Sequence, residues 1–238
     1  MPVIEDLLAG LGPDRPVRQA LIGAHWTAVE SRSLGLASAL REPCPDHPAD
    51  PVKDAGALAE HSALEICRLA RSQSTLEASL GLAAVNSLLD PMAGEEINAE
   101  QLIVEKGTGR GVAVIGHFPF ISRLREQVRD LWVLEKRPRP GDLSAEQADD
   151  ILPRADVVAI SATTLINHTL DAILSRCRPD SFRIMLGATT PLSDVLFDHG
   201  FQALCGVQVD DAARVLRFVA QGATFRQIRG LRRICIRR

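Results

Sequence analysis

The chain has 238 residues, of which 46% are hydrophobic and 24% charged, which is ordinary for a globular protein with one large domain or two small ones. Its formal net charge of -3 gives no general reason to expect a nucleic-acid partner. Apolar runs stay below about 18 residues and the N-terminus is short, acidic and broken by proline, so we expect neither a membrane span nor a signal peptide and predict a cytoplasmic protein.

The first half of the chain, residues 1–105, is predicted to be a small α+β domain. Its predicted elements, in chain order, are a helix at 3–11, a strand pair or short meander at 17–41, a proline-rich loop at 41–56 and helices at 58–72 and 74–90. Ser74 and Glu77 are spaced as a capping box at the start of the last helix.

The second half, residues 106–238, is predicted to be a Rossmann-like domain. Continuous apolar runs, typical of buried parallel strands, alternate here with helical patterns, which indicates an α/β fold with a parallel sheet covered by helices on both faces. The predicted strands lie at 111–115, 130–136, 155–162, 182–188 and 201–209. Helices are predicted at 120–128, 144–152, 164–177 and 210–222, and a turn at 137–142. Ile228, Leu231 and Ile234 recur at helical spacing, so the arginine-rich end is predicted to be a last amphipathic helix. Its basic face is either solvated or binds an anion or partner.

Polar residues follow each predicted strand. Because ligands of open parallel sheets bind beyond the carboxyl ends of the strands, these residues are the candidate site. They are His117, Phe118, Glu135, Thr163, Thr164, Asn167, His168, Thr189, Thr190 and Pro191. The stretch GHFPFI does not match the G-x-G-x-x-G loop, so classical NAD binding is not expected, and Glu135 is either a ribose-type ligand or a surface residue.

The two threonine pairs and the histidines carry different chemistry. Each Thr-Thr pair stands where a strand turns towards a helix, so its hydroxyls either cap that helix or help to bind an anion there. His117 and His168 are candidate transition-metal ligands or general bases, against the simpler role of buried hydrogen bonding. The five cysteines are odd in number and scattered, which predicts neither a zinc knuckle nor a disulfide framework. Cys205 is either core or an added sulfur ligand.

Four motifs in order, EASLGLAAVNSLL, VIGHFPFI, LPRADVVAISATTLINHTLDAIL and IMLGATTPLSDVLFDHGFQALCGVQVDD, resemble the family named the putative heavy-metal chelation domain. The resemblance covers nearly the whole chain. It implies an enolase-N-terminal-like domain joined to a Rossmann-like domain, with a site between them for a heavy metal or a metal-binding small molecule. The matching positions are Asn86, His117, Thr163, Thr164, Asn167, His168, Thr190 and Pro191. Ala162 and Ala188 depart from the family pattern, which puts the shape of the ligand in doubt.

Three hypotheses follow. The first is a polar interdomain cleft that binds a transition metal or a metal-chelating small molecule, with His117 and His168 as ligands and Asn86 reaching across from the first domain. The second is a metal-independent enzyme that acts on a small anionic or nucleotide-like metabolite through a histidine general acid or base. The third is a regulatory or scaffold module that uses the arginine-rich end. In each case a homodimer is left open, and no nucleic acid or membrane is expected as a partner.

Overall fold

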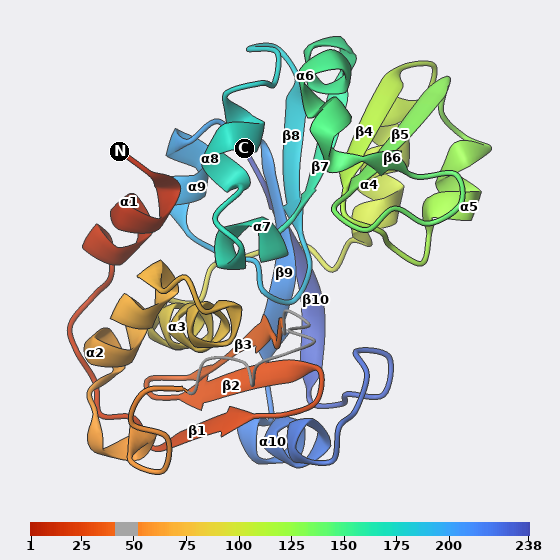
Figure 1. The fold of residues 1–238 in the computed structure, drawn as a ribbon. Coiled ribbons are helices and arrows are strands. Elements are labelled where there is room, and N and C mark those ends of the chain that lie inside the picture. Colours follow the sequence, from red (N-terminus) through yellow and green to blue (C-terminus); the bar gives the residue numbers. More distant parts are fainter. Residues whose placement is uncertain (41–51) are drawn as a thin grey trace.

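The computed structural model describes residues 1–40 and 52–238, arranged around two β-sheets (Figure 1). Most of the loop predicted at 41–56, with Cys44 and His47, lies outside the described residues. Within the described ranges, no helix combines the length and the apolar character needed to cross a membrane.

The smaller sheet is an antiparallel meander, which confirms the prediction for the first half of the chain. It consists of β1 (Gln19–Ile22), β2 (Trp26–Glu30) and β3 (Leu34–Ser38), in that order. Alternate residues of these strands pack in opposite directions: Val29 joins the core beneath α3 (Thr75–Leu88), whereas Ala28 joins the cluster around α10 (Ala212–Ala220). A helix from the far end of the chain therefore covers one face of the small sheet.

The larger sheet has seven strands in the order β10-β9-β8-β7-β4-β5-β6. The strands are β4 (Gly111–Ile115), β5 (Asp130–Glu135), β6 (Leu143–Ser144), β7 (Val157–Ser161), β8 (Phe182–Leu186), β9 (Ala203–Val209) and β10 (Leu231–Arg237). The first six are parallel and β10 runs antiparallel to β9. Counted from β4, the parallel strands have the order 3-2-1-4-5-6 of the Rossmann fold, which confirms the predicted architecture.

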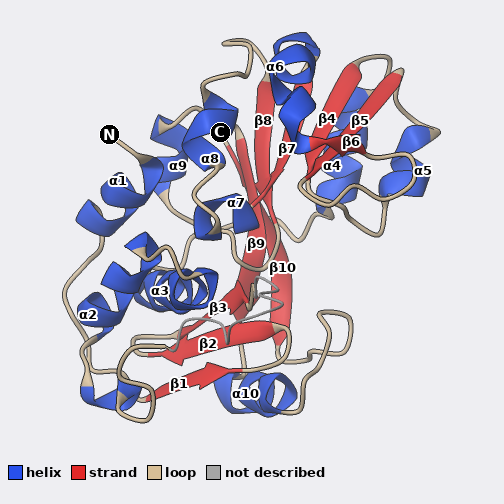
Figure 2. Ribbon diagram, viewed as in Figure 1, coloured by secondary structure: helices blue, strands red, loops and turns tan. Residues whose placement is uncertain are grey.

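Helices cover both faces of this sheet (Figure 2). Val112 and Val114 pack with α4 (Ala99–Gly107) and α5 (Ile121–Arg125), while Ala113 between them joins the core on the opposite face. That second face is covered by α6 (Ala148–Ile151), α7 (Thr163–Ile166), α8 (Leu170–Leu174) and α9 (Asp194–Asp198). The remaining helices are α1 (Val3–Ala9), α2 (Ala63–Cys67) and short 3₁₀ turns at Leu58–Glu60, Arg68–Arg71, Ala145–Gln147 and Leu152–Arg154.

The prediction of a helix over the arginine-rich end is wrong, because residues Leu231–Arg237 form the edge strand β10. Gly230, just before it, has a φ of 94°, a left-handed conformation that interrupts a helix at little cost only in glycine. The open edge of β9 then supplies backbone partners along the whole strand. Helical spacing of apolar residues cannot reveal such a long-range partner.

Three other predictions need local correction. The helix predicted at 164–177 is split into α7 and α8, and His168 between them has a φ of 55°. The helix predicted at 58–72 is broken into α2 and two 3₁₀ turns. The capping box at Ser74 is only half formed: Ser74 accepts from the Glu77 backbone N–H, but the Glu77 carboxylate binds the Lys53 N–H and the Ser72 hydroxyl.

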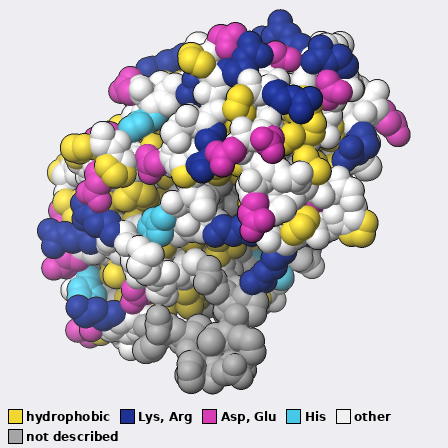
Figure 3. All heavy atoms as spheres, turned by 45° about the horizontal axis from the view of Figure 1, so that its top comes forward, with side chains coloured by type: hydrophobic (Ala, Val, Ile, Leu, Met, Phe, Trp, Pro, Cys, Tyr) yellow, Lys and Arg dark blue, Asp and Glu magenta, His cyan; other side chains and the backbone are white. Residues whose placement is uncertain are grey.

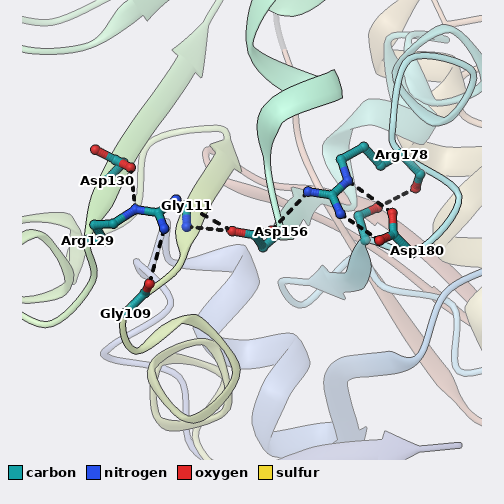
Figure 4. Close-up of polar contacts among 8 residues, drawn as sticks. Gly109, Gly111, Arg129, Asp130, Asp156, Arg178 and Asp180 are labelled. Atoms are coloured by element: carbon teal, nitrogen blue, oxygen red, sulfur yellow. Dashed lines mark hydrogen bonds and ion pairs between the residues drawn. The ribbon is translucent and has the colours of Figure 1, made fainter.

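Charged groups tie together the amino ends of the central strands (Figure 4). Asp156, directly before β7, accepts a hydrogen bond from the Gly111 N–H at 2.9 Å and pairs with Arg178 at 3.0 Å. Arg129 approaches the same carboxylate at 3.8 Å and binds Asp130 at 2.8 Å. At the amino ends of these strands the charged side chains thus pair with one another and with the backbone.

Candidate functional site

The candidate site lies where the strand order of the large sheet reverses, between β4 and β7. From this point the chain builds β5 and β6 to one side and β8 and β9 to the other, so the loops after β4 and β7 part and leave a crevice. Gly116 ends β4 with a φ of 104°, and a Cβ on it would lie only 3.1 Å from the Ser161 Cβ. Glycine is therefore required for the two strand ends to approach this closely.

A cavity of about 410 Å³, hereafter the central cavity, opens beside this crevice between the two sheets. Small-molecule sites typically have volumes of roughly 300–1,000 Å³. Trp26 and Ser38 line it from the small sheet. The loops after β4, β7 and β8 line it from the large sheet, and among the predicted site residues they contribute Phe118, Thr163 and Thr189. The cavity is thus lined by residues from both halves of the chain, and its identity with the predicted interdomain site stays a prediction.

Hydrogen bonds between the two halves of the chain connect residues of one wall of the central cavity. The Ser38 N–H donates to Thr189 Oγ1 at 2.9 Å, and the Thr189 hydroxyl donates to Ser38 Oγ at 3.2 Å. Asn86 Nδ2 donates to the carbonyl oxygens of Leu36 at 2.9 Å and Thr189 at 3.0 Å. Asn86 thus reaches from the first half of the chain to the second, where its amide nitrogen contacts the backbone.

Aromatic rings form the apolar part of the lining. Phe118 and Phe120 stack with their centroids 5.3 Å apart and their planes within 10° of parallel. Trp26 and Phe225 meet with centroids 5.6 Å apart. All four rings line the central cavity. The Phe-Pro-Phe stretch that replaces a glycine-rich loop therefore supplies a wall of the cavity.

The charged part of the lining is dominated by arginine. Arg123 is neutralised by Glu100, to which it donates two hydrogen bonds of 2.8 and 2.6 Å. Arg233 lies over the Phe225 ring at 5.2 Å. Neither Arg226 nor Arg233 is paired with a carboxylate among residues 1–40 and 52–238. Within the described residues, the lining of the cavity thus includes two guanidinium groups without a carboxylate partner.

A second cavity of about 450 Å³, the lateral cavity, lies on the β5 side of the crevice and shares Ser161 and Thr163 with the first. Of the predicted site residues it is lined by Glu135, Thr163, Thr164 and Asn167. Glu135 Oε1 accepts the His117 backbone N–H at 2.6 Å. This bond fixes the turn after β4, a role that neither interpretation of Glu135 from the sequence anticipated.

The threonine pairs do not cap helices, which was one of the two roles that the sequence left open for them. The residue before α7 is Ala162 and the N-cap of α9 is Ser193. Thr164 Oγ1 donates to the Ser161 carbonyl at 2.7 Å and Thr190 Oγ1 donates to the Cys205 carbonyl at 3.2 Å, and both side chains are buried. Thr163 keeps its hydroxyl at the cavity surface, paired with Ser161 Oγ at 2.8 Å.

The two candidate metal-binding histidines face different surroundings. His117 Nδ1 lies 2.9 Å from Asp142 Oδ2, whose side chain is 2% exposed. His168 Nε2 lies 2.8 Å from the Ser72 carbonyl and lines a third cavity, near α1. His117 and Pro191 line none of these three cavities. The described residues contain no group of three or more His, Cys, Asp or Glu side chains placed to hold a metal ion, and the histidines visible in Figure 3 lie apart.

Several residues of the site were not predicted. Trp26, Phe225, Arg226 and Arg233 come from the small sheet and from the chain end that was predicted as a helix, so no strand-end rule could find them. Asp142 stood in a predicted turn without a motif. The absence of any disulfide framework was also a wrong prediction, because Cys205 and Cys235 form a disulfide between β9 and β10.

Comparison with known proteins gives consistent matches. Two family models, both described as putative heavy-metal chelation, match residues 4–89 and 98–237. An uncharacterized protein of Methanocaldococcus jannaschii is 29% identical over 174 residues, which cover 68% of this chain and 67% of that protein. A crystal structure of a protein with unknown function from Desulfitobacterium hafniense, of the DUF364 family, has a TM-score of 0.86 at 26% identity over 99% of this chain and 98% of the other. A second member of that family, from Pyrococcus horikoshii, has a TM-score of 0.81 at 21% identity over 100% and 98% of the two chains, and shows the same fold.

Proposed function

Since this chain belongs to the putative heavy-metal chelation family, we propose that it binds a small, anionic, metal-chelating organic molecule in the central cavity. The observation that carries the proposal is the pair of arginines, Arg226 and Arg233, that face an aromatic-lined cavity without a carboxylate partner among the described residues. Guanidinium groups bind carboxylates through paired, charge-assisted hydrogen bonds. The four aromatic rings suit a planar apolar portion of the same ligand.

In this proposal the metal arrives as part of the ligand. The described residues do not assemble a three-donor centre, so we assign no step to a metal held by the protein alone. Trp26, Phe118, Phe120 and Phe225 exclude water from the apolar face of the ligand, and the arginines neutralise its carboxylates. Ser161 and Thr163, shared by both cavities, offer hydroxyls towards a polar edge of the ligand.

Isothermal titration calorimetry tests the proposal with quinoline-2-carboxylate, a planar aromatic chelator, its zinc complex, zinc chloride alone and citrate. We expect the aromatic carboxylate and its complex to bind, and zinc chloride and citrate to bind more weakly. Arg226→Gln and Arg233→Gln should each weaken binding about tenfold or more, because each removes a charge-assisted contact. Arg217→Gln is the matched control, since Arg217 is an exposed arginine on α10 outside the cavity.

The same titration separates this proposal from direct metal binding by histidine. Tight binding of zinc chloride alone that is lost in His117→Ala or His168→Ala would support the ligand role predicted for those residues from the sequence. Quinoline-2-carboxylate binding that is equal in wild type and in both cavity arginine variants would contradict our proposal.

A second candidate, a metal-independent enzyme, is favoured by the His117–Asp142 pair. A buried carboxylate that holds one imidazole nitrogen fixes the ring and directs the other nitrogen outward, as in histidine general bases. Mass spectrometry of a defined set of nucleotides and carboxylates, incubated with the protein, tests this candidate. Turnover that disappears in both His117→Ala and Asp142→Ala would favour it over simple binding.

A further inference from the structure

Cys205 on β9 and Cys235 on β10 stand directly opposite each other in adjacent antiparallel strands. The backbone N–H and C=O of Cys235 bond to Glu95 on its other side, at 2.8 and 2.9 Å. The two cysteines are therefore a non-hydrogen-bonded pair, the kind in which antiparallel strands bring their Cα atoms closest. Their Cα atoms are 4.1 Å apart, and the two side chains form a disulfide.

This pair belongs to the wall of the central cavity. Cys205 lines the cavity together with Arg233 and Ile234, the two residues that precede Cys235. Cys205 is 6% exposed and Cys235 1% exposed, so a reagent would reach the pair from the side of Cys205. Chemistry at this position would occur next to the proposed ligand.

The other cysteines within the described residues are poorly placed for the same chemistry. Burial raises the pKa of the Cys67 thiol to about 12 and that of the Cys177 thiol to about 11. Both are unpaired. Thiolates are the form that binds metals and reacts, so at neutral pH these two thiols are nearly inert. Cys44 lies outside the described residues.

We propose that reduction of the Cys205–Cys235 disulfide opens a two-sulfur binding site for thiophilic heavy-metal or metalloid ions in the wall of the central cavity. A phosphine or dithiol reductant supplies two electrons, the S–S bond breaks and each sulfur takes a proton. A trivalent arsenoxide then forms two As–S bonds, and its oxygen leaves as water with the two thiol protons, so arsenic stays in the +3 state. Soft thiolates select such ions over hard cations.

The site is independent of the organic ligand proposed above, because it needs only the two opposed sulfurs. It also gives a role to the Cys205–Cys235 pair, which takes no part in the proposed binding of the organic ligand. The arginines and hydroxyls of the cavity have no affinity for soft cations, whereas two sulfurs on facing strands can hold one atom between them. The disulfide state would thus decide whether the cavity wall binds such ions.

The test is the reaction of the full chain with phenylarsine oxide, a reagent for paired thiols, followed by intact-mass spectrometry. After reduction with a phosphine, we expect one phenylarsenic adduct per chain. The oxidised protein should take up none at this site. Since both samples have the same sequence, this comparison does not depend on whether any variant folds.

Variants then place the adduct. Cys205→Ser and Cys235→Ser should each abolish stable adduct formation, because one remaining thiol holds arsenic weakly. Cys44→Ser and Cys177→Ser are the matched controls and should retain one adduct, with circular dichroism confirming that each variant is folded. Absence of an adduct on the reduced wild-type protein, or an adduct unchanged in both Cys205→Ser and Cys235→Ser, would overturn the proposal.

Discussion

Thr189 illustrates how a residue at the predicted site can serve the architecture around it. Its side chain is 1% exposed although the residue borders the central cavity. Its hydroxyl accepts the Ser38 N–H, and its carbonyl accepts from Asn86. Each of these bonds joins one half of the chain to the other. The residue therefore connects the two halves beside the central cavity.

We predict that Thr189→Val lowers the free energy of unfolding by about 1–3 kcal/mol, because the Ser38 N–H loses its hydrogen-bond acceptor. Urea denaturation followed by circular dichroism measures the change. Thr163→Val is the control, since the Thr163 hydroxyl pairs only with Ser161 Oγ at the cavity surface, and its loss should cost less than about 1 kcal/mol. Equal losses in the two variants would show that the interdomain bond has no special role.

At the scale of elements, Gly35 determines how closely β3 lies on α3. A Cβ at this position would stand 2.0 Å from the Ala83 carbonyl oxygen and 2.4 Å from the Ser87 N, both backbone atoms of the helix. The helix can approach the strand only because glycine leaves this space free. That approach brings Asn86, between these contacts, within reach of Leu36 and Thr189.

Gly35→Ala is accordingly expected to destabilise the protein by about 3 kcal/mol or more, because backbone atoms cannot yield as a flexible side chain would. Thermal or urea unfolding gives the magnitude. Gly12→Ala serves as the matched control: no atom lies within 4 Å of its added Cβ, and the expected change is within about 0.5 kcal/mol. A Gly35→Ala protein as stable as the control would show that β3 and α3 can separate without cost.

The elements that the sequence predicted are those whose pattern is local. The runs at β4 and β7 are apolar on both faces until their last residue, and this pattern identifies them as central parallel strands. The prediction for β10 was wrong because this strand depends on its partner β9, which is remote in sequence. The strand-end rule likewise found Phe118, Thr163 and Thr189 at the cavity, but the direction of each hydroxyl depends on tertiary contacts that no spacing reveals.

At the scale of the whole molecule, each half of the chain packs a terminal helix against the other half (Figure 1). α1, from the first half, packs on α9, and its Val3 N–H donates to Asp171 at 3.0 Å. α10, from the second half, packs on β1 and β2. One cluster of buried residues also runs from Val29 in the small sheet to Met185 in the large one. The domain boundary predicted at residue 105 therefore stays a prediction.

We expect the chain to unfold as one cooperative unit, since separating the halves would expose the shared core and the packed faces of α1 and α10. The protein has two tryptophans, and they report on different sheets: Trp26 lies in β2 and Trp132 in β5. In Trp132→Phe the fluorescence follows the small sheet, and in Trp26→Phe it follows the large one. For each variant, the urea midpoint from fluorescence should match the urea midpoint from circular dichroism. Because both midpoints come from the same variant, a change in stability caused by the substitution does not affect the comparison. A fluorescence transition well before the circular dichroism transition in either variant would show that the halves unfold separately.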